Sequence, residues 1–349
     1  MFVKNSWYVA AWSEDVGSNQ PVARTVIGEP LVLFRNADGS VAALEDRCAH
    51  RRMPLSLGRV TGDGRLVCTY HGLTYDGTGA CVLVPGQDSP GGIRIRSYPV
   101  EERANMVFVW MGPPTLADIS EIPDCSWLED PRHQATKLYR HADANYLLLN
   151  DNLADLLHVA YLHIPSGGGS EDMGSAETDL ALADDGYHFV RKTNDIPAPA
   201  GYGRLSNARG NIDRWHLVDF RGPSFYRIHT GVAEAGSGGA ESTLPTGQGR
   251  WAIMPHHFIT PETENSTHYF QVVAHEWEPS SDSWRFLNAV IDEDVWAIQH
   301  QQASLDSDPE IRMQEIASDG PMYAMRDIVE RMVVAETAGV RAKQMEKAH

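Results

Sequence analysis

Short apolar runs separated by polar turns dominate the first third of the chain. Each run is long enough for one strand, and turn pairs such as Asp38-Gly39 and Asp76-Gly77 separate neighbouring runs. Several short strands at this spacing predict a small all-β sandwich or barrel. The runs lie at 25–27, 31–34, 41–44, 66–68, 82–84 and 107–110.

The pattern changes after Gly112-Pro113-Pro114, where we place a domain boundary. Residues 144–163 are helical in character, and Pro165 ends that stretch because proline disfavours a helical residue before it. Longer strand-like runs then predict a second sheet, and helical segments follow at about 281–303 and 320–345. The strand-like runs lie at 187–191, 225–228, 251–254 and 268–274, and the glycine-rich segment 235–249 is expected to be a mobile loop or lid.

Composition limits the partners and the compartment. The chain has 349 residues, with 29 Lys and Arg against 47 Asp and Glu and a formal charge of −18. That balance argues against nucleic acid and anionic membranes, which attract clustered positive charge. No apolar run approaches the ~18 residues that span a bilayer, and we find no signal peptide. Four cysteines are too few for a disulfide framework, so we expect a reducing, cytoplasmic setting.

Two cysteines and two histidines form the first candidate site. The segments Cys48-Ala49-His50 and Cys68-Thr69-Tyr70-His71 each join a thiolate to an imidazole on a tight loop. Tetrahedral zinc accepts this set, but zinc sites commonly pair cysteines on one segment and histidines on the other. Because each loop here offers one of each, the pattern favours a Rieske [2Fe–2S] centre, with residues 83–86 as a covering loop. Cys81 and Cys125 lie in neither loop, and we expect them to be small buried side chains.

The second candidate site lies in the helical stretch 144–163. Asn152, Asp155 and His158 are three residues apart and share one helix face. His158 and His163 are five apart, about 140° around a regular helix, so the helix must bulge or unwind near 159–162 for both to reach one ion. Two histidines and one carboxylate are the ligand set of non-haem iron that binds O2. The acids at 292–294 are the best source of that carboxylate.

Together these segments resemble the oxygenase component of a Rieske non-haem iron oxygenase, nearest to the vanillate and dicamba O-demethylase group, whose enzymes have α subunits only. The resemblance implies an α+β fold, with a Rieske domain over 1–115 and a catalytic domain over 116–349 that holds an antiparallel sheet and helices in a helix-grip-like arrangement. It rests on segments that cover nearly the whole chain, namely 5–11, 48–71, 152–163, 260–263 and 293–294.

The resemblance also assigns roles to individual residues. Asp294 becomes the third iron ligand beside His158 and His163, and Asp155 and Asn152 are implied to have catalytic roles. Asp155 matches an acid that bridges a ligand histidine of its own chain and His71 of a neighbouring subunit in a homotrimer. Electrons from NAD(P)H then pass through a ferredoxin, a flavin reductase or both to the cluster at Cys48, His50, Cys68 and His71.

The expected reaction is hydroxylation of an alkyl carbon next to N or O of a small aromatic compound, followed by loss of an aldehyde, as in aromatic compound catabolism. Ile228, His257 and Trp284 align with substrate-facing positions of relatives. Ile228 replaces a polar side chain there, which favours a neutral substrate such as a chloroacetanilide-type amide over a methoxy-aromatic acid. Ring or other C–H hydroxylation, a Rieske electron carrier without oxygenase activity and a zinc-stabilised structural protein remain alternatives.

Overall fold

The computed structural model describes residues 1–131, 133–275, 280–310 and 312–346 and divides the chain into two compact units. The first unit holds Met1–Cys125 together with Thr260–Glu264, and the second holds Ser126–Ile259 and the chain from Asn265 onward. The first unit thus runs to Cys125, whereas the sequence placed the boundary after residue 115. None of the helices in the described ranges is long and apolar enough to cross a membrane.

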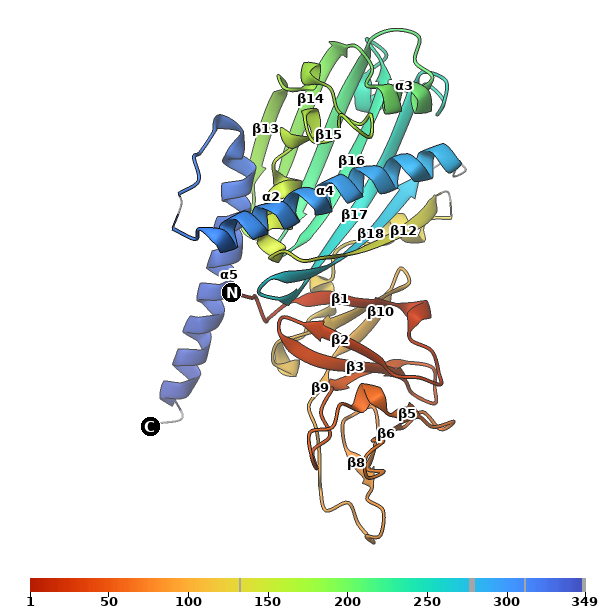
Figure 1. Ribbon diagram of the computed structural model, residues 1–349, viewed down its shortest axis with the longest axis vertical. Helices are drawn as coiled ribbons and strands as arrows, with labels where there is room; N and C mark the ends of the chain where they lie inside the picture. The colour runs from red at the N-terminus through yellow and green to blue at the C-terminus, as the bar shows by residue number, and fades with distance from the viewer. Residues whose placement is uncertain (132, 276–279, 311, 347–349) are drawn as a thin grey trace. The chain divides into compact units, whose positions relative to one another are not determined.

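Three small antiparallel sheets build the first unit (Figure 1). The first has the order β1 (Trp7–Trp12), β11 (Met106–Trp110), β10 (Val100–Arg103). The second has the order β2 (Val22–Val26), β3 (Glu29–Arg35), β4 (Val41–Glu45), β9 (Ser97–Tyr98), and the third runs β5 (Arg59–Val60), β6 (Leu66–Val67), β7 (Thr74–Tyr75), β8 (Cys81–Leu83). This confirms the predicted all-β N-terminal domain.

The second sheet of this unit is buried on both faces. Successive side chains of a strand point to opposite faces, and β3 uses both. Leu31 and Leu33 pack in one hydrophobic cluster with the first sheet, whereas Val32 and Phe34 pack in another with the third sheet. Cys48 and Cys68 belong to this other cluster, so the second core anchors the cysteine-bearing loops.

One seven-stranded antiparallel sheet and its helices build the second unit. The strand order is β12 (Gln134–Ala142), β18 (Ser266–His275), β17 (Arg250–Thr263), β16 (Phe225–Glu234), β15 (Ile212–Arg221), β14 (Gly186–Ile196), β13 (Glu177–Leu182). The helices are α1 (Ser126–Glu129), α2 (Tyr146–Ala154), α3 (Ala200–Ser206), α4 (Ser281–Ser307) and α5 (Gly320–Glu346), and α4 crosses one face of the sheet (Figure 1). The α+β class is therefore confirmed, and segment 235–249 joins β16 to β17.

Helix α4 forms because its sequence supplies a cap and an apolar stripe. The Ser280 hydroxyl accepts a hydrogen bond from the Ser283 N–H (3.1 Å), which caps the first turn. Leu287, Ile291 and Ile298 recur at helical spacing and are buried. The stripe also holds Asp294, so the helix that crosses the sheet delivers one buried carboxylate to the interior of the unit.

The predicted helix over 144–163 is interrupted earlier than expected. Helix α2 ends at Ala154, Asp155 has extended backbone (φ −86°, ψ 94°), and a short 3-10 turn at His158–Ala160 follows. The Asp155 carboxylate accepts from the Leu157 N–H (2.9 Å), a local turn that competes with helix continuation. The chain therefore leaves the helix before His158, rather than between 159 and 162 as predicted.

Candidate metal centres and substrate cavity

Two loops with matching backbone hydrogen bonds carry the four predicted cluster ligands. In each loop the N–H of the cysteine donates a hydrogen bond to the carbonyl of the residue five positions later. The carbonyl of the same cysteine accepts a hydrogen bond from the N–H of the residue four positions later, and all four bonds measure 2.8–3.0 Å. Arg52 and Gly72 take corresponding positions with positive φ (58° and 75°). The donor–acceptor pairs are Cys48–Met53, Arg52–Cys48, Cys68–Leu73 and Gly72–Cys68.

The side chains of the two loops come together as a dinuclear cluster requires. The rings of His50 and His71 lie 4.5 Å apart between centroids and are exposed, whereas Cys48 and Cys68 are buried. Burial raises the pKa of the Cys68 thiol, and the neighbouring Cys48 thiol raises it further. Metal binding must therefore displace the thiol protons. Residues 83–86, the predicted covering loop, approach the second cysteine loop, since a Cβ on Gly72 would lie 3.0 Å from Pro85 Cγ.

Tyr75 is a residue of this site that the sequence analysis missed. Its hydroxyl accepts from the Ala49 N–H (3.1 Å) and lies 3.3 Å from Cys48 Sγ. Because the hydroxyl already accepts from Ala49, its own proton is free for the Cys48 sulfur. Hydrogen bonds to cluster sulfurs raise the reduction potential.

We expect Tyr75→Phe to lower the reduction potential of the cluster by about 40 mV, the one-electron equivalent of one hydrogen bond of about 1 kcal/mol. The hydrogen bond stabilises the reduced, more negative cluster, so its loss favours the oxidised form. Protein-film voltammetry measures the shift. Tyr98→Phe is the control, because the Tyr98 hydroxyl donates to Glu29 (2.8 Å). An unchanged potential in Tyr75→Phe would contradict the assignment.

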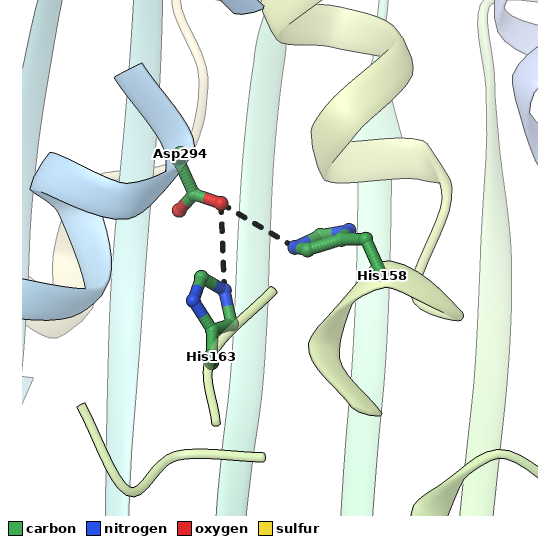
Figure 2. A group of neighbouring side chains, drawn as sticks. All are labelled: His158, His163 and Asp294. Atoms are coloured by element: carbon green, nitrogen blue, oxygen red, sulfur yellow. Dashed lines mark ion pairs between the residues drawn. The ribbon is translucent and has the colours of Figure 1, made fainter. Parts of the chain in front are cut away.

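His158, His163 and Asp294 converge inside the second unit (Figure 2). One ligand atom from each lies within 4.8 Å of the others, and the Nε2 atoms of both histidines lie 3.4 Å from Asp294 Oδ1. His163 and Asp294 are buried, and His158 is partly exposed. Two imidazoles and one carboxylate fit a mononuclear Fe(II) with open coordination positions.

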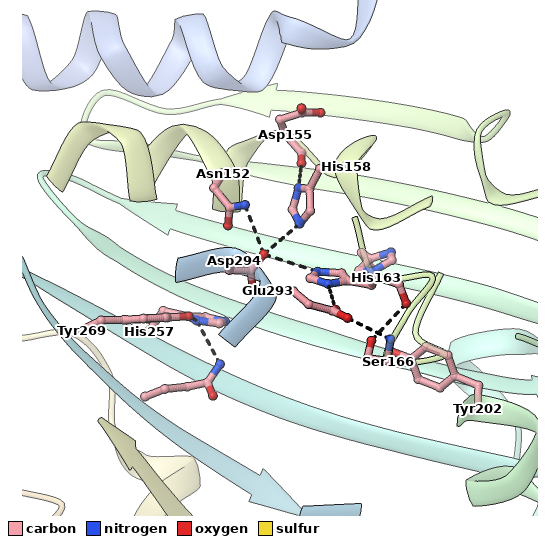
Figure 3. Close-up of polar contacts among 12 residues, drawn as sticks. Asn152, Asp155, His158, His163, Ser166, Tyr202, His257, Tyr269, Glu293 and Asp294 are labelled. Carbon is pink, nitrogen blue, oxygen red and sulfur yellow. Dashed lines mark hydrogen bonds and ion pairs between the residues drawn. The ribbon is translucent and has the colours of Figure 1, made fainter. Parts of the chain in front are cut away.

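The far nitrogen of each imidazole is held by an oxygen (Figure 3). His163 Nδ1 contacts Glu293 Oε2 at 2.8 Å, and His158 Nδ1 contacts the backbone carbonyl of Asp155. Both oxygens accept, so each Nδ1 carries the proton and each Nε2 keeps its lone pair on the Asp294 side. Ligand histidines commonly have such an acceptor on the other ring nitrogen, so the tautomers suit metal binding.

Electrostatics couple the three side chains. Burial by itself raises the pKa of Asp294, but His163, His158 and the Asn152 amide outweigh it and hold the pKa below its ordinary value. For His158 burial lowers the pKa, and the contact with Asp294 outweighs it, so the pKa is raised. The Asp294 carboxylate therefore favours positive charge at the Nε2 atoms of both histidines. A metal cation bound there would supply that charge.

Glu293 is the second residue that the sequence analysis missed as a contributor. Its Oε1 accepts from the Ser166 N–H (2.8 Å) while Oε2 accepts from His163. We expect Glu293→Gln to weaken iron binding by about 10–100-fold, because an amide has one acceptor oxygen for two donors. Fe(II) titration of the metal-depleted protein measures the loss.

Asp292→Asn is the control for Glu293→Gln. Asp292 is the preceding residue on α4, is largely exposed and pairs with Arg140 (2.7 Å). We expect it to bind iron as the unaltered chain does. Equal iron affinity in the two variants would contradict the orienting role of Glu293.

Asn152 and Asp155 lie beside the triad with different contacts. Asn152 Nδ2 donates to Asp294 Oδ1 (3.1 Å), so the amide positions the carboxylate. Asp155 contacts His158 through its backbone carbonyl, whereas its carboxylate accepts from the Leu157 N–H. The resemblance implies a contact between Asp155 and a ligand histidine of its own chain. That contact exists, but the backbone carbonyl of Asp155 makes it and the carboxylate does not.

A cavity that is partly open to solvent begins at the triad. Most of its lining is apolar, with a few polar side chains, as in sites that bind small molecules. Of the three positions predicted to face the substrate, Ile228 and His257 line the cavity and Trp284 does not. Trp284 lies nearer the start of α4, and the helix presents Phe286, Leu287 and Ile291 to the cavity instead.

His257 offers one hydrogen to this cavity. Its Nδ1 accepts from Tyr269 (2.6 Å) and Gln271 (3.2 Å), so the proton lies on Nε2. Burial lowers the pKa of His257 to about 3, so the ring is neutral. The buried Nε2 has no protein partner in the described ranges, which leaves an N–H donor for a substrate acceptor.

Comparisons with known proteins give matches along nearly the whole chain. The family model "Vanillate O-demethylase oxygenase C-terminal domain" matches residues 142–335, and "Rieske [2Fe-2S] domain" matches residues 6–99. A putative toluene-4-sulfonate monooxygenase system iron-sulfur subunit of Comamonas testosteroni is 35% identical, over 97% of this chain and 99% of that protein. A vanillate O-demethylase oxygenase subunit of Pseudomonas sp. is 33% identical, over 96% of each chain.

The structure also matches a solved one. The crystal structure of dicamba monooxygenase bound to 3,6-dichlorosalicylic acid superposes with a TM-score of 0.85 at 32% identity, covering 97% of this chain and 99% of that one. The fold and the domain order of the structure thus agree with the two family models and with the solved relative.

Proposed function

The chain belongs to the vanillate O-demethylase family of Rieske oxygenases, and from this premise we propose that it dealkylates an aromatic ether or N-alkyl compound. Enzymes of this family are monooxygenases with a [2Fe–2S] cluster and a mononuclear iron. One observation carries the proposal: His158, His163 and Asp294 stand at the wall of a largely apolar cavity. An electron carrier needs no such cavity beside an open metal site.

We assign the cofactors to named side chains. Cys48 and Cys68 would hold one iron of the cluster, and His50 and His71 would hold the other. His158, His163 and Asp294 would hold the mononuclear iron, and the two groups together would supply the electrons and the activation of O2. The cavity walls orient the alkyl group toward the triad, and His257 holds a substrate acceptor through Nε2–H. The bond between the hydroxylated carbon and the aromatic O or N then breaks: that carbon leaves as an aldehyde, and the O or N takes up the proton of the new hydroxyl group.

Electrons come from NAD(P)H through a ferredoxin, a flavin reductase or both. Exposure of His50 and His71 supports this route, because the two imidazoles would hold one cluster iron near the protein surface. We place the same surface against a neighbouring subunit of a homotrimer for transfer to that subunit's iron. The setting is the cytoplasm.

The first experiment measures iron, zinc and acid-labile sulfide on anaerobically purified protein, with EPR after dithionite reduction. The proposal expects about three irons and about two sulfides per chain with a rhombic signal of low average g. Methoxy- and N-alkyl-aromatic compounds are then tested for aldehyde release with matching O2 and NAD(P)H consumption. Zinc without sulfide would overturn the cofactor assignment.

A second candidate, hydroxylation of a ring carbon or another C–H bond without dealkylation, is favoured by the similarity to the toluene-4-sulfonate monooxygenase subunit. Product analysis separates the two. A hydroxylated product without aldehyde would support the second candidate over the first.

A further inference from the structure

A buried positive charge without an acidic partner forms part of the cavity wall. Arg214 on β15 is 2% exposed and lines the cavity. In the part of the chain that the structure describes, no acidic side chain forms an ion pair with it. Its terminal nitrogens donate to neutral groups alone, namely the carbonyls of Trp215 and Gly231, Thr230 Oγ1, Tyr202 Oη and His216 Nε2.

Two N–H donors of this cluster have no acceptor. Arg214 Nε and His216 Nδ1 are buried and unpartnered within the described residues. A guanidinium only donates, so His216 Nε2 is an acceptor for Arg214 and the His216 proton lies on Nδ1. Buried donors are rarely left unpaired in native proteins, and His216 also lines the cavity. The missing partner is therefore an acceptor.

Charge decides which acceptor fits. An uncompensated buried cation is strongly unfavourable, and a neutral acceptor would leave that penalty in place. A carboxylate or sulfonate supplies the opposite charge and several acceptor oxygens. The Tyr202 ring lies 4.4 Å from Arg214 Cζ and fixes the guanidinium by a cation–π contact, so the donors are held in place before the ligand arrives.

We propose that Arg214 and His216, here named the anion subsite, bind a carboxylate or sulfonate group on the aromatic substrate. This inference rests on the proposed function, because the same cavity reaches His158 and Asp294. The anion subsite fixes one end of the ring, and the alkyl group to be oxidised lies toward the triad.

This inference reverses the expectation of a neutral substrate drawn from Ile228. Strand pairing places Ile228 opposite Val218 and Thr230 opposite His216, so the anion subsite lies farther along the same face of the sheet. The donor that relatives carry at the Ile228 position is thus replaced by donors on β15. A carboxylate can remain paired although Ile228 is apolar.

The chain offers a matched control in Arg191. It is a second buried arginine, on β14 directly opposite His216, and it donates to the Met173 carbonyl. It is not among the residues that line the cavity. Arg191→Met therefore removes a buried charge next to the anion subsite without changing the cavity wall, whereas Arg214→Met changes the wall itself.

The test is calorimetric titration of anaerobic, iron-replete protein with the three methoxybenzoate isomers, the corresponding methoxybenzenesulfonates and the neutral methoxybenzamides. The unaltered chain is expected to bind at least one anion about 10–100-fold more tightly than its amide, as hydrogen bonds to charged groups imply. Arg214→Met should lose this preference, and Arg214→Lys and Arg191→Met should keep most of it. The comparison of anion and amide affinities in the unaltered chain does not depend on whether any variant folds.

Three outcomes would overturn the anion subsite: equal affinity for anions and amides, no binding of any anion, or an unchanged preference in Arg214→Met. Binding is measured without turnover, so the result is separate from the proposed function. Selective anion binding without aldehyde release would contradict dealkylation alone. Aldehyde release from the amides with equal affinity for the anions would contradict the anion subsite alone.

Discussion

Asp294→Asn is expected to remove the mononuclear iron and to lower dealkylation by more than about a hundredfold, with the cluster unchanged. Asp294 is the single carboxylate of the triad, and its Oδ1 lies 3.4 Å from each Nε2. The amide has nearly the same shape, so the fold is preserved, but it lacks the negative charge that balances a divalent cation. Fe(II) affinity falls accordingly.

Iron and sulfide analysis measures this effect directly. The expected result for Asp294→Asn is about two irons with about two sulfides per chain, and an unchanged Rieske EPR signal. Asp292→Asn again serves as the control, since Asp292 lies on the same helix but pairs with Arg140. A variant that keeps the third iron and full activity would contradict the assignment of Asp294.

The cluster loops were predictable because their determinants are local. Each loop places one thiol and one imidazole within four residues, and the positive φ that follows suits Gly72. His158 and His163 could be singled out for the same reason. The backbone conformation that brings these histidines together could not be predicted. An aspartate inside a helical pattern can continue the helix or, as Asp155 does, end it with a turn, and the sequence is the same in both cases.

Roles that depend on distant elements could not be predicted from local spacing, and Asp294 was assigned only through the family resemblance. Glu293 and Asp294 are adjacent acids about 100° apart on α4, and the position of the helix over the sheet decides which one faces the histidines and which one accepts from His163 Nδ1. Trp284 was placed by alignment, yet the helix presents other side chains to the cavity.

Arg214 had a detectable signal that the sequence analysis did not use. Along β15, Arg214, His216, Val218 and Phe220 alternate with residues of the other face, and all four are buried. A charged residue in the inward register of a buried strand is unusual, because charged residues are rarely buried without a partner. The sequence shows the register, but only the structure shows that the neighbours are neutral.

His71→Ala is expected to abolish the [2Fe–2S] cluster and, with it, more than about 99% of the activity, because one iron loses one of its two protein ligands. The mononuclear iron should stay, because its ligands belong to the other unit. Visible absorption, sulfide content and EPR measure the loss. Tyr70→Phe is the control: the Tyr70 ring lies beside the His71 ring with centroids 3.9 Å apart and planes tilted by 34°, and phenylalanine keeps the ring. A retained cluster in His71→Ala would contradict the ligand assignment.

The two inactive variants together test where the electron travels. His71→Ala chains keep the iron and Asp294→Asn chains keep the cluster, so neither can act within one chain. If electrons cross between subunits of a ring-shaped trimer, co-assembled variants should recover up to about a quarter of the activity, because half the chains hold iron and half of those have a cluster-bearing neighbour on the required side. The control is a mixture of the two separately assembled variants under conditions in which their subunits do not exchange. No recovery after verified co-assembly would contradict transfer between subunits.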